Sequence, residues 1–302
     1  MAPEIPLLII AFNRPDFLES RLLEAERYKI PQVIVSIDGP NGSQNLEFQK
    51  LCSRFVSTKY LGTQVSFIFR ESSLGMARHV TTAISEVLES YPGVVVLEDD
   101  IEMSKHFFSG ISSALQKFGN KYFGVSGFSP LSIGSKLPNC WRESKYISIW
   151  GWGVTSDSWK KYQFELKDSD LQALEESRTW NKLPQAEREI WLRRFRKVIE
   201  NPAFTWDSQI QFACFKYDLK NLSSVFRTSE NLGFQDARST NTKTIRPRIL
   251  GKHSLNQGRV RDLRIPRIVS ARMEFFDQIS IAGTRKITTT LFRRRNRAAE
   301  GL

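Results

Sequence analysis

Three consecutive carboxylates, Glu98, Asp99 and Asp100, directly follow the apolar run Val94–Leu97. That run has the composition of a buried strand, so the three acids stand where the strand ends. Their mutual repulsion is costly unless a cation offsets it, and Mg²⁺ or Mn²⁺ commonly takes one or two carboxylates together with substrate phosphates. The pattern favours a Mn²⁺ or Mg²⁺ site that holds a phosphate-bearing ligand over a plain acidic turn.

Polar residues also follow two earlier apolar runs and open a later helix. Arg14 follows Ile5–Phe12, and Asp38 follows Gln32–Ile37. Arg14 is suited to pair with a phosphate, and Asp38 to accept hydrogen bonds from a ribose. His79 stands near the start of a predicted helix. Each of the three equally suits a structural role: a surface arginine, a turn-forming aspartate, a core histidine.

The elements that position these residues alternate between strand and helix. The apolar patterns predict strands at Ile5–Phe12, Gln32–Ile37, Gln64–Phe69 and Val94–Leu97, and helices over 16–28 with Asp16 as N-cap, near Leu46–Val56, and over Gly75–Ser90. Such alternation predicts an α/β fold with a wound, mostly parallel mixed sheet flanked by helices. Right-handed crossovers then bring the strand ends to one edge, where ligands bind in such sheets.

The second part of the chain is less regular. We expect strands at Tyr122–Gly127 and Leu222–Phe226, and helices ending near Tyr162 and spanning Pro184–Ile199 and Asp207–Lys216. The helix over Pro184–Ile199 is amphipathic and is expected at the surface. Trp150, Trp152 and Trp206 offer faces for stacking on a sugar or for packing in the core.

The composition excludes several classes of protein. The chain has 302 residues, of which 40% are hydrophobic and 25% charged, with 21 Phe and 7 Trp. A large core is therefore available, and a mainly disordered chain is excluded. The longest apolar run is far shorter than a membrane span, and the start has no signal-peptide pattern. Three widely spaced cysteines give neither a zinc spacing nor a disulfide framework, so we expect a cytoplasmic protein.

Positive charge is concentrated at the end of the chain. The net charge is +12, and residues 236–302 hold 16 Lys and Arg against 5 Asp and Glu. The nearly neutral remainder argues against a body built to hold nucleic acid. Apolar residues interleave with the basic ones, which predicts a helical tail lying on an anionic membrane surface, as a peripheral protein on its inner face; a solvated tail is the alternative.

Several stretches together resemble a known enzyme family. They are Leu7–Arg14 (LLIIAFNR), Ile34–Gly39 (IVSIDG), Leu74–His79 (LGMARH), Val94–Phe108 (VVVLEDDIEMSKHFF), Ile149–Trp159 (IWGWGVTSDSW) and the pair Trp206-Asp207. In this order they resemble GT-A fold glycosyltransferases, most closely the N-acetylglucosaminyltransferase I family in a shortened, bacterial-like form. The resemblance covers roughly residues 5–235, which gives a GT-A domain over 1–235 and a basic tail over 236–302.

The resemblance implies a role for each matching residue. Arg14, Asp38 and His79 would contact the nucleotide, Glu98 and Asp99 would face the uridine and ribose, Asp100 would bind the metal, and Asp207 would be the general base. Related bacterial proteins often carry a histidine soon after the segment matching 231–234, which this chain lacks. Trp152 and Trp206 remain candidate contacts for the sugar or acceptor.

The expected function is therefore metal-dependent, inverting transfer of a sugar from a nucleotide-diphosphate donor, such as a UDP-sugar, to a hydroxyl of a glycan or lipid-linked glycan. A nucleotidyltransferase acting on sugar phosphates would use a similar sheet, metal and nucleotide. The basic tail also suggests a nucleic-acid binding protein, although no known nucleic-acid motif is present. A sugar-binding relative without catalysis is the remaining alternative.

Overall fold

The computed structural model describes residues 4–40, 48, 50, 52–53, 55–130, 136–234, 236, 238 and 254–265. The strands are β1 (Leu7–Ala11), β2 (Gln32–Ile37), β3 (Gln64–Phe69), β4 (Gly93–Glu98), β5 (Ile101–Met103), β6 (Tyr122–Ser126), β7 (Asn139–Ser144), β8 (Trp152–Thr155), β9 (Lys220–Ser224), β10 (Ser229–Asn231) and β11 (Val260–Arg264). The helices are α1 (Pro15–Arg27), α3 (Met76–Ser90), α4 (Phe107–Phe118), α5 (Ser156–Trp159), α6 (Asp168–Gln172), α7 (Arg178–Asn181), α8 (Gln185–Glu200) and α9 (Asp207–Lys216), with 3₁₀ turns at Gly119–Lys121, Ala173–Glu176 and Pro202–Phe204.

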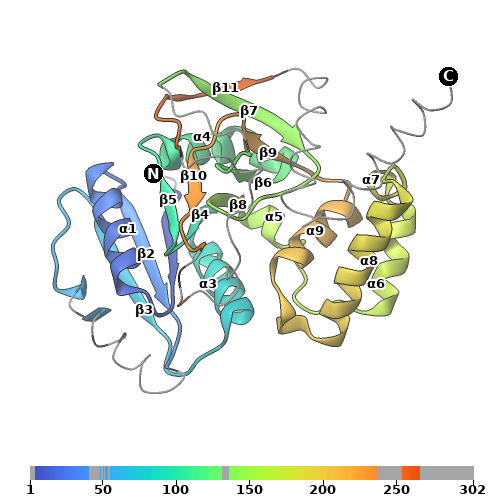
Figure 1. The fold of residues 1–302 in the computed structure, drawn as a ribbon, viewed down its shortest axis with the longest axis horizontal. Coiled ribbons are helices and arrows are strands. Elements are labelled where there is room, and N and C mark those ends of the chain that lie inside the picture. The colour runs from blue at the N-terminus through green and yellow to red at the C-terminus, as the bar shows by residue number, and fades with distance from the viewer. Residues whose placement is uncertain are drawn as a thin grey trace.

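A mixed, mostly parallel sheet with helices on both faces forms the centre of the molecule (Figure 1). Within the described residues the strand order is β11-β7-β9-β6-β8-β4-β1-β2-β3, with β10 and β5 paired separately. The four strands β3, β2, β1 and β4 are parallel, as the alternation of strands and helices predicts. Strand β8 lies antiparallel between β4 and β6 and joins the two halves of the sheet.

Both faces of β1 are buried, which explains its unbroken apolar sequence. Leu7 and Ile9 pack in one hydrophobic cluster together with residues of α1 and α4. Leu8 and Ile10 belong to a second cluster, formed with α3 and α9. Successive strand residues point to opposite faces, so one apolar run supplies both clusters. The strand end that carries the polar residues is thereby fixed from two sides.

Helices α6 to α9 gather at the end of the molecule away from β3 (Figure 1). Their buried aromatic residues form a third cluster, which includes Trp180, Trp191, Phe195 and Phe215. The prediction of a helix over Pro184–Ile199 is close to α8. One side of the helix is buried, with Trp191 only 1% exposed and packed against α9, and the opposite side is exposed, as expected of an amphipathic surface helix.

Several element boundaries match the predictions, and others differ. β2, β3 and α9 have the predicted limits. Asp16 is not the N-cap of α1: Arg14 is, because Pro15 occupies the first helical position, where its missing N–H is no loss. The helix expected near Leu46–Val56 lies only partly within the described residues, which are helical at 48, 50, 52–53 and 55–56.

Part of the expected tail belongs to the sheet. Strand β11 pairs in parallel with β7, although it lies beyond the predicted domain limit at residue 235. The sheet thus continues past that limit. The helical tail expected over 236–302 is a strand at Val260–Arg264, and most of the rest of it lies outside the described residues. No helix in the described ranges is long and apolar enough to cross a membrane.

Candidate functional site

Parallel pairing brings the polar strand ends to one edge of the sheet. Ile10 of β1 lies opposite Glu98 of β4, and Ala11 lies opposite Ile37 of β2. The backbone N–H of Asp99 donates to the carbonyl of Ile10 at 2.9 Å. The chain segments that carry Arg14, Asp38 and the three acids therefore converge, as the sequence predicts.

Arg14 bridges two of the acids at this edge. Its Nη1 donates to Oδ2 of Asp100 at 2.8 Å, and its Nη2 donates to Oδ1 of Asp99. The three side chains are 11%, 6% and 2% exposed, so the ion pairs are nearly withdrawn from water. Charge-assisted hydrogen bonds in such surroundings are strong, and they hold the two carboxylates in fixed positions.

Three acids, Glu98, Asp99 and Asp100, stand beside one cation, Arg14, at this edge. The pKa values of Glu98 and Asp99 are raised. Burial, helped by the negative charges of Asp100 and Asp99, raises the pKa of Glu98 to about 8. Burial also raises the pKa of Asp99 to about 7, although Arg14 opposes that shift. One guanidinium does not balance the charge of three ionised acids, so the cluster can bind a further positive charge.

The residues present fit a divalent ion held by one or two carboxylates. Oδ2 of Asp99 and Oδ1 of Asp100 are buried and have no hydrogen-bond partner. Within the described residues no group of three His, Cys, Asp or Glu side chains converges on one point. Mg²⁺ is typically bound by one or two carboxylates, with water and substrate phosphates completing the shell. The site therefore suits an ion that arrives with a phosphate ligand and does not suit a closed structural metal.

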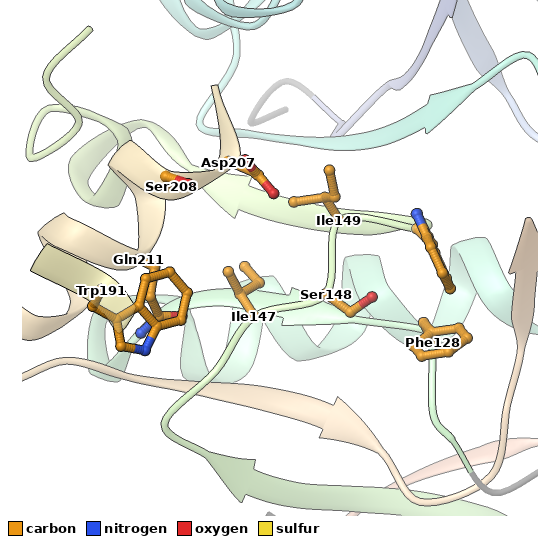
Figure 2. A pocket seen from close by; sticks show the side chains of 9 residues that line it. Phe128, Ile147, Ser148, Ile149, Trp191, Asp207, Ser208 and Gln211 are labelled. Carbon is orange, nitrogen blue, oxygen red and sulfur yellow. The ribbon is translucent and has the colours of Figure 1, made fainter. Parts of the chain in front are cut away.

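A cavity of about 200 Å³ lies beside the start of α9 (Figure 2). In Figure 2 the carboxylate of Asp207 points toward Ile149, and Trp191 and Gln211 lie at the end opposite Phe128. The lining residues are Phe128, Ile147, Ser148, Ile149, Trp150, Trp191, Asp207, Ser208 and Gln211. Apolar walls with a few polar groups are typical of a site that binds a small molecule or one ring of a larger one.

Asp207 lies in the first turn of α9, where the helix dipole stabilises a negative charge. The hydroxyl of Thr205 donates a hydrogen bond to its Oδ1. The charge of Asp207 contributes to the raised pKa of Glu98, so the cavity and the acid cluster lie within electrostatic reach of each other. An ionised carboxylate in this position can accept a proton from a hydroxyl bound in the cavity.

Asp38 and His79 both make hydrogen bonds within the protein, and their contacts with a nucleotide stay predictions. Each oxygen of Asp38 accepts two protein hydrogen bonds, from the N–H of Gly39 and Leu74 and from the Ser73 hydroxyl and the Gly75 N–H. These bonds use all the lone pairs of the carboxylate. His79 is buried against the Ser36 hydroxyl at 2.9 Å, and burial lowers its pKa to about 4.

The two tryptophans predicted as sugar contacts are buried in the core. Trp152 has no exposed surface and Trp206 is 3% exposed, and their rings stack with centroids 6.0 Å apart. Neither ring is exposed in this structure, and a role of either ring in sugar binding stays a prediction. Of Trp150, Trp152 and Trp206, Trp150 lines the cavity. Its ring packs edge-on against the ring of Phe128, with the ring centroids 4.8 Å apart. The glycines between these tryptophans gave no signal of which ring would turn outward.

Sequence reasoning missed most of the cavity. Gln211 lies one turn after Asp207 on α9, and its Nε2 donates to the carbonyl of Lys145 while its Oε1 is buried without a partner. Nε1 of Trp191 is also buried without a partner. The spacing of Asp207 and Gln211 on one helix face was a signal that could have been used. The sequence of the Ile147–Trp150 loop gave no such signal, because the position of this loop depends on how the strands of the sheet are arranged.

Comparisons with known protein families and with curated proteins give no match for this chain. The site itself is therefore the ground for a functional conclusion. It consists of a buried Arg14–Asp99–Asp100 cluster at the carboxyl edge of a parallel sheet and, within electrostatic reach of Glu98, a small cavity with Asp207 in its wall.

Proposed function

We propose that the protein is a metal-dependent glycosyltransferase with a GT-A type architecture, which moves a sugar from a nucleotide-diphosphate donor to a hydroxyl of a glycan acceptor. The observation that carries the proposal is the pair of buried, unpartnered carboxylate oxygens on Asp99 and Asp100 at the end of β4. An ion with phosphate ligands would satisfy them, and a diphosphate is the phosphate that a sugar donor supplies. The resemblance of the motifs to the N-acetylglucosaminyltransferase I family supports the same activity.

Asp100, with Asp99 beside it, would hold Mn²⁺ or Mg²⁺. The bound ion would offset the negative charge that develops on the departing diphosphate. Arg14 lies next to both acids and is positioned to pair with the same diphosphate, because its planar guanidinium matches phosphate oxygens. Glu98 directly precedes the pair and would face the uridine and ribose of the donor, as the resemblance implies.

Asp207 is the proposed general base. It would accept the proton of an acceptor hydroxyl bound in the cavity as that oxygen attacks the anomeric carbon of the donor sugar. The bond between the anomeric carbon and the diphosphate oxygen breaks, and the nucleoside diphosphate leaves. Attack on the face opposite the leaving group gives inversion of the anomeric configuration. The products are the glycoside and the nucleoside diphosphate.

A thermal-shift screen of UDP- and GDP-linked sugars, with and without Mn²⁺, tests the donor class. A donor that binds the native state raises the unfolding midpoint by mass action, and the proposal expects this rise to depend on Mn²⁺. The product then separates the two metal-dependent reactions. Release of nucleoside diphosphate supports glycosyl transfer, whereas release of pyrophosphate from a nucleoside triphosphate and a sugar phosphate identifies a nucleotidyltransferase.

The proposed setting is a cytoplasmic protein, associated peripherally with an anionic membrane through its basic terminal segment. The 16 Lys and Arg of residues 236–302 support this part of the proposal. Flotation of the full chain with vesicles containing anionic lipid, compared with vesicles of neutral lipid, tests it. A chain that remains unbound with both vesicles would remove the membrane from the proposal.

A further inference from the structure

The buried acid pair Asp99 and Asp100 has a resident cation, the side chain of Arg14. Two separate bonds hold the guanidinium, one to each carboxylate, and Nη1 lies 2.8 Å from Oδ2 of Asp100. Each carboxylate therefore gives one oxygen to Arg14 and keeps the other unpartnered. Protein thus satisfies one oxygen of each acid, and the other oxygen of each is buried without a hydrogen-bond partner.

Two positive charges cannot share this space at low cost. Like charges a few ångströms apart repel strongly at the effective dielectric of a partly buried site. Arg14 and both acids are almost withdrawn from water, with exposed fractions of 11%, 2% and 6%, so solvent screens the repulsion poorly. A divalent ion bound by Asp100 must therefore compete with the guanidinium.

The surroundings make Arg14 a movable partner. Its Nε is buried and forms no hydrogen bond, so the two terminal nitrogens make the hydrogen bonds of the head group to the acids. The guanidinium also lies over the ring of Phe17, 5.3 Å from the ring centroid, and this contact is independent of the acids. The backbone beside Asp100 is fixed, since the N–H of Leu232 donates to the Asp100 carbonyl at 2.8 Å.

We propose that Arg14 is a placeholder cation, which neutralises Asp99 and Asp100 in the free protein, weakens binding of a divalent ion alone, and is released from the acids when ion and diphosphate bind together. The inference rests on the proposed function and adds to it how binding of the ion and binding of the diphosphate depend on each other. The ion and the diphosphate bind cooperatively, because the diphosphate gives Arg14 a new partner at the moment when the ion takes its place.

Calorimetric titration of the metal-free full chain with Mn²⁺ alone tests this role without any activity measurement. Arg14→Gln removes the competing charge, and its Kd for Mn²⁺ falls at least about tenfold below that of the unmodified chain. Arg14→Lys keeps one charge without the two-pronged contact and gives an intermediate Kd. Arg178→Gln is the matched control, because Arg178 is 89% exposed and lies 3.9 Å from Asp218; its Kd is unchanged.

Cooperativity gives a second measurement. Addition of UDP tightens Mn²⁺ binding to the unmodified chain by a larger factor than it tightens binding to Arg14→Gln, since in the variant no guanidinium has to be moved. Should the glutamine variant not fold without metal, Arg14→Lys carries the comparison, and the rise of its unfolding midpoint on adding Mn²⁺ replaces the titration.

The outcomes separate the inference from the proposed function. Tighter Mn²⁺ binding in Arg14→Gln, abolished by adding Asp100→Asn, supports both. Measurable Mn²⁺ binding that Arg14→Gln leaves equal or weaker overturns the placeholder role and leaves the metal site standing. Absence of Mn²⁺ binding in every variant, with and without UDP, overturns the metal-dependent function together with the inference.

Discussion

Gly233 lies directly against the carboxylate of Asp100: a Cβ atom built on this glycine would be 2.2 Å from Oδ2. The N–H of Gly233 donates to the side chain of Asn231 at 2.7 Å, which fixes the close approach. Strand β10 ends at Asn231, so the segment that follows it closes over the acid cluster. No other residue type fits here unless the Asp100 side chain moves.

Gly233→Ala tests this contact. The added methyl group must displace the Asp100 carboxylate, and we expect Mn²⁺-dependent donor binding to weaken about tenfold or more, with a loss of stability of about 1–3 kcal/mol from overpacking. Donor titration and denaturant unfolding measure the two effects separately. A variant that binds donor and Mn²⁺ like the unmodified chain would show that Asp100 does not need its present position.

Asp207→Asn tests the general base. The amide keeps the size and the hydrogen bond from Thr205 but cannot accept the acceptor proton, so we expect transfer to fall by about 10²–10⁴-fold while donor affinity is retained. Asp157→Asn is the matched control, because this acid is exposed and pairs with Lys160 on the surface. Turnover of Asp207→Asn equal to that of the control would assign the proton transfer to another group.

Gln211→Met tests the cavity as the place of the acceptor. Methionine has nearly the same length but no amide, so a hydroxyl bound there loses one hydrogen bond, worth about 1 kcal/mol. We expect an increase of several-fold in the acceptor KM with unchanged donor affinity. Gln163→Met, at a residue that pairs with Lys216 away from the cavity, is the control. Equal acceptor KM values in both variants would place the acceptor elsewhere.

His79 predicts a pH dependence of stability. Its folded pKa of about 4 lies below its ordinary value of 6.5, mainly because burial disfavours the charged ring. The unfolded chain binds this proton more readily, so the contribution is complete above pH 6.5 and is lost as the pH falls toward 4. The slope from this group is at most about 1.4 kcal/mol per pH unit.

Denaturant unfolding of the unmodified chain and of His79→Gln across that pH range measures the contribution as a difference. Glutamine does not titrate, and it can still bond the Ser36 hydroxyl, which His79 contacts at 2.9 Å. The variant should lose less stability between pH 6.5 and 4 than the unmodified chain does. Parallel stability curves would mean that His79 is not kept neutral by the fold.

The sequence predicted the first half of the fold well because its signals were local. The apolar runs of β1, β2 and β3 are bounded by Pro, Gly and Asp, and each supplies its own strand. The convergence of Arg14 with Asp99 and Asp100 followed from parallel pairing alone. Fold class and acid cluster could thus be argued without coordinates.

Features that depend on distant segments could not be predicted. The lone pairs of Asp38 are used by residues 73–75, which lie more than 30 positions away. Strand β10 is buried yet polar in sequence, so it has no hydrophobic pattern to reveal it. Trp152 lies in a central strand and stacks on the distant Trp206, a contact that neither motif reveals by itself.

Anomalous diffraction from crystals grown with Mn²⁺ and a UDP- or GDP-linked sugar that raises the unfolding midpoint tests the central claim most directly. We predict one strong manganese peak at the Asp100 carboxylate, shared with the donor diphosphate, and the donor sugar directed toward Asp207. A bound donor with manganese absent from Asp99 and Asp100, while Arg14 still bridges those two acids, would contradict the account.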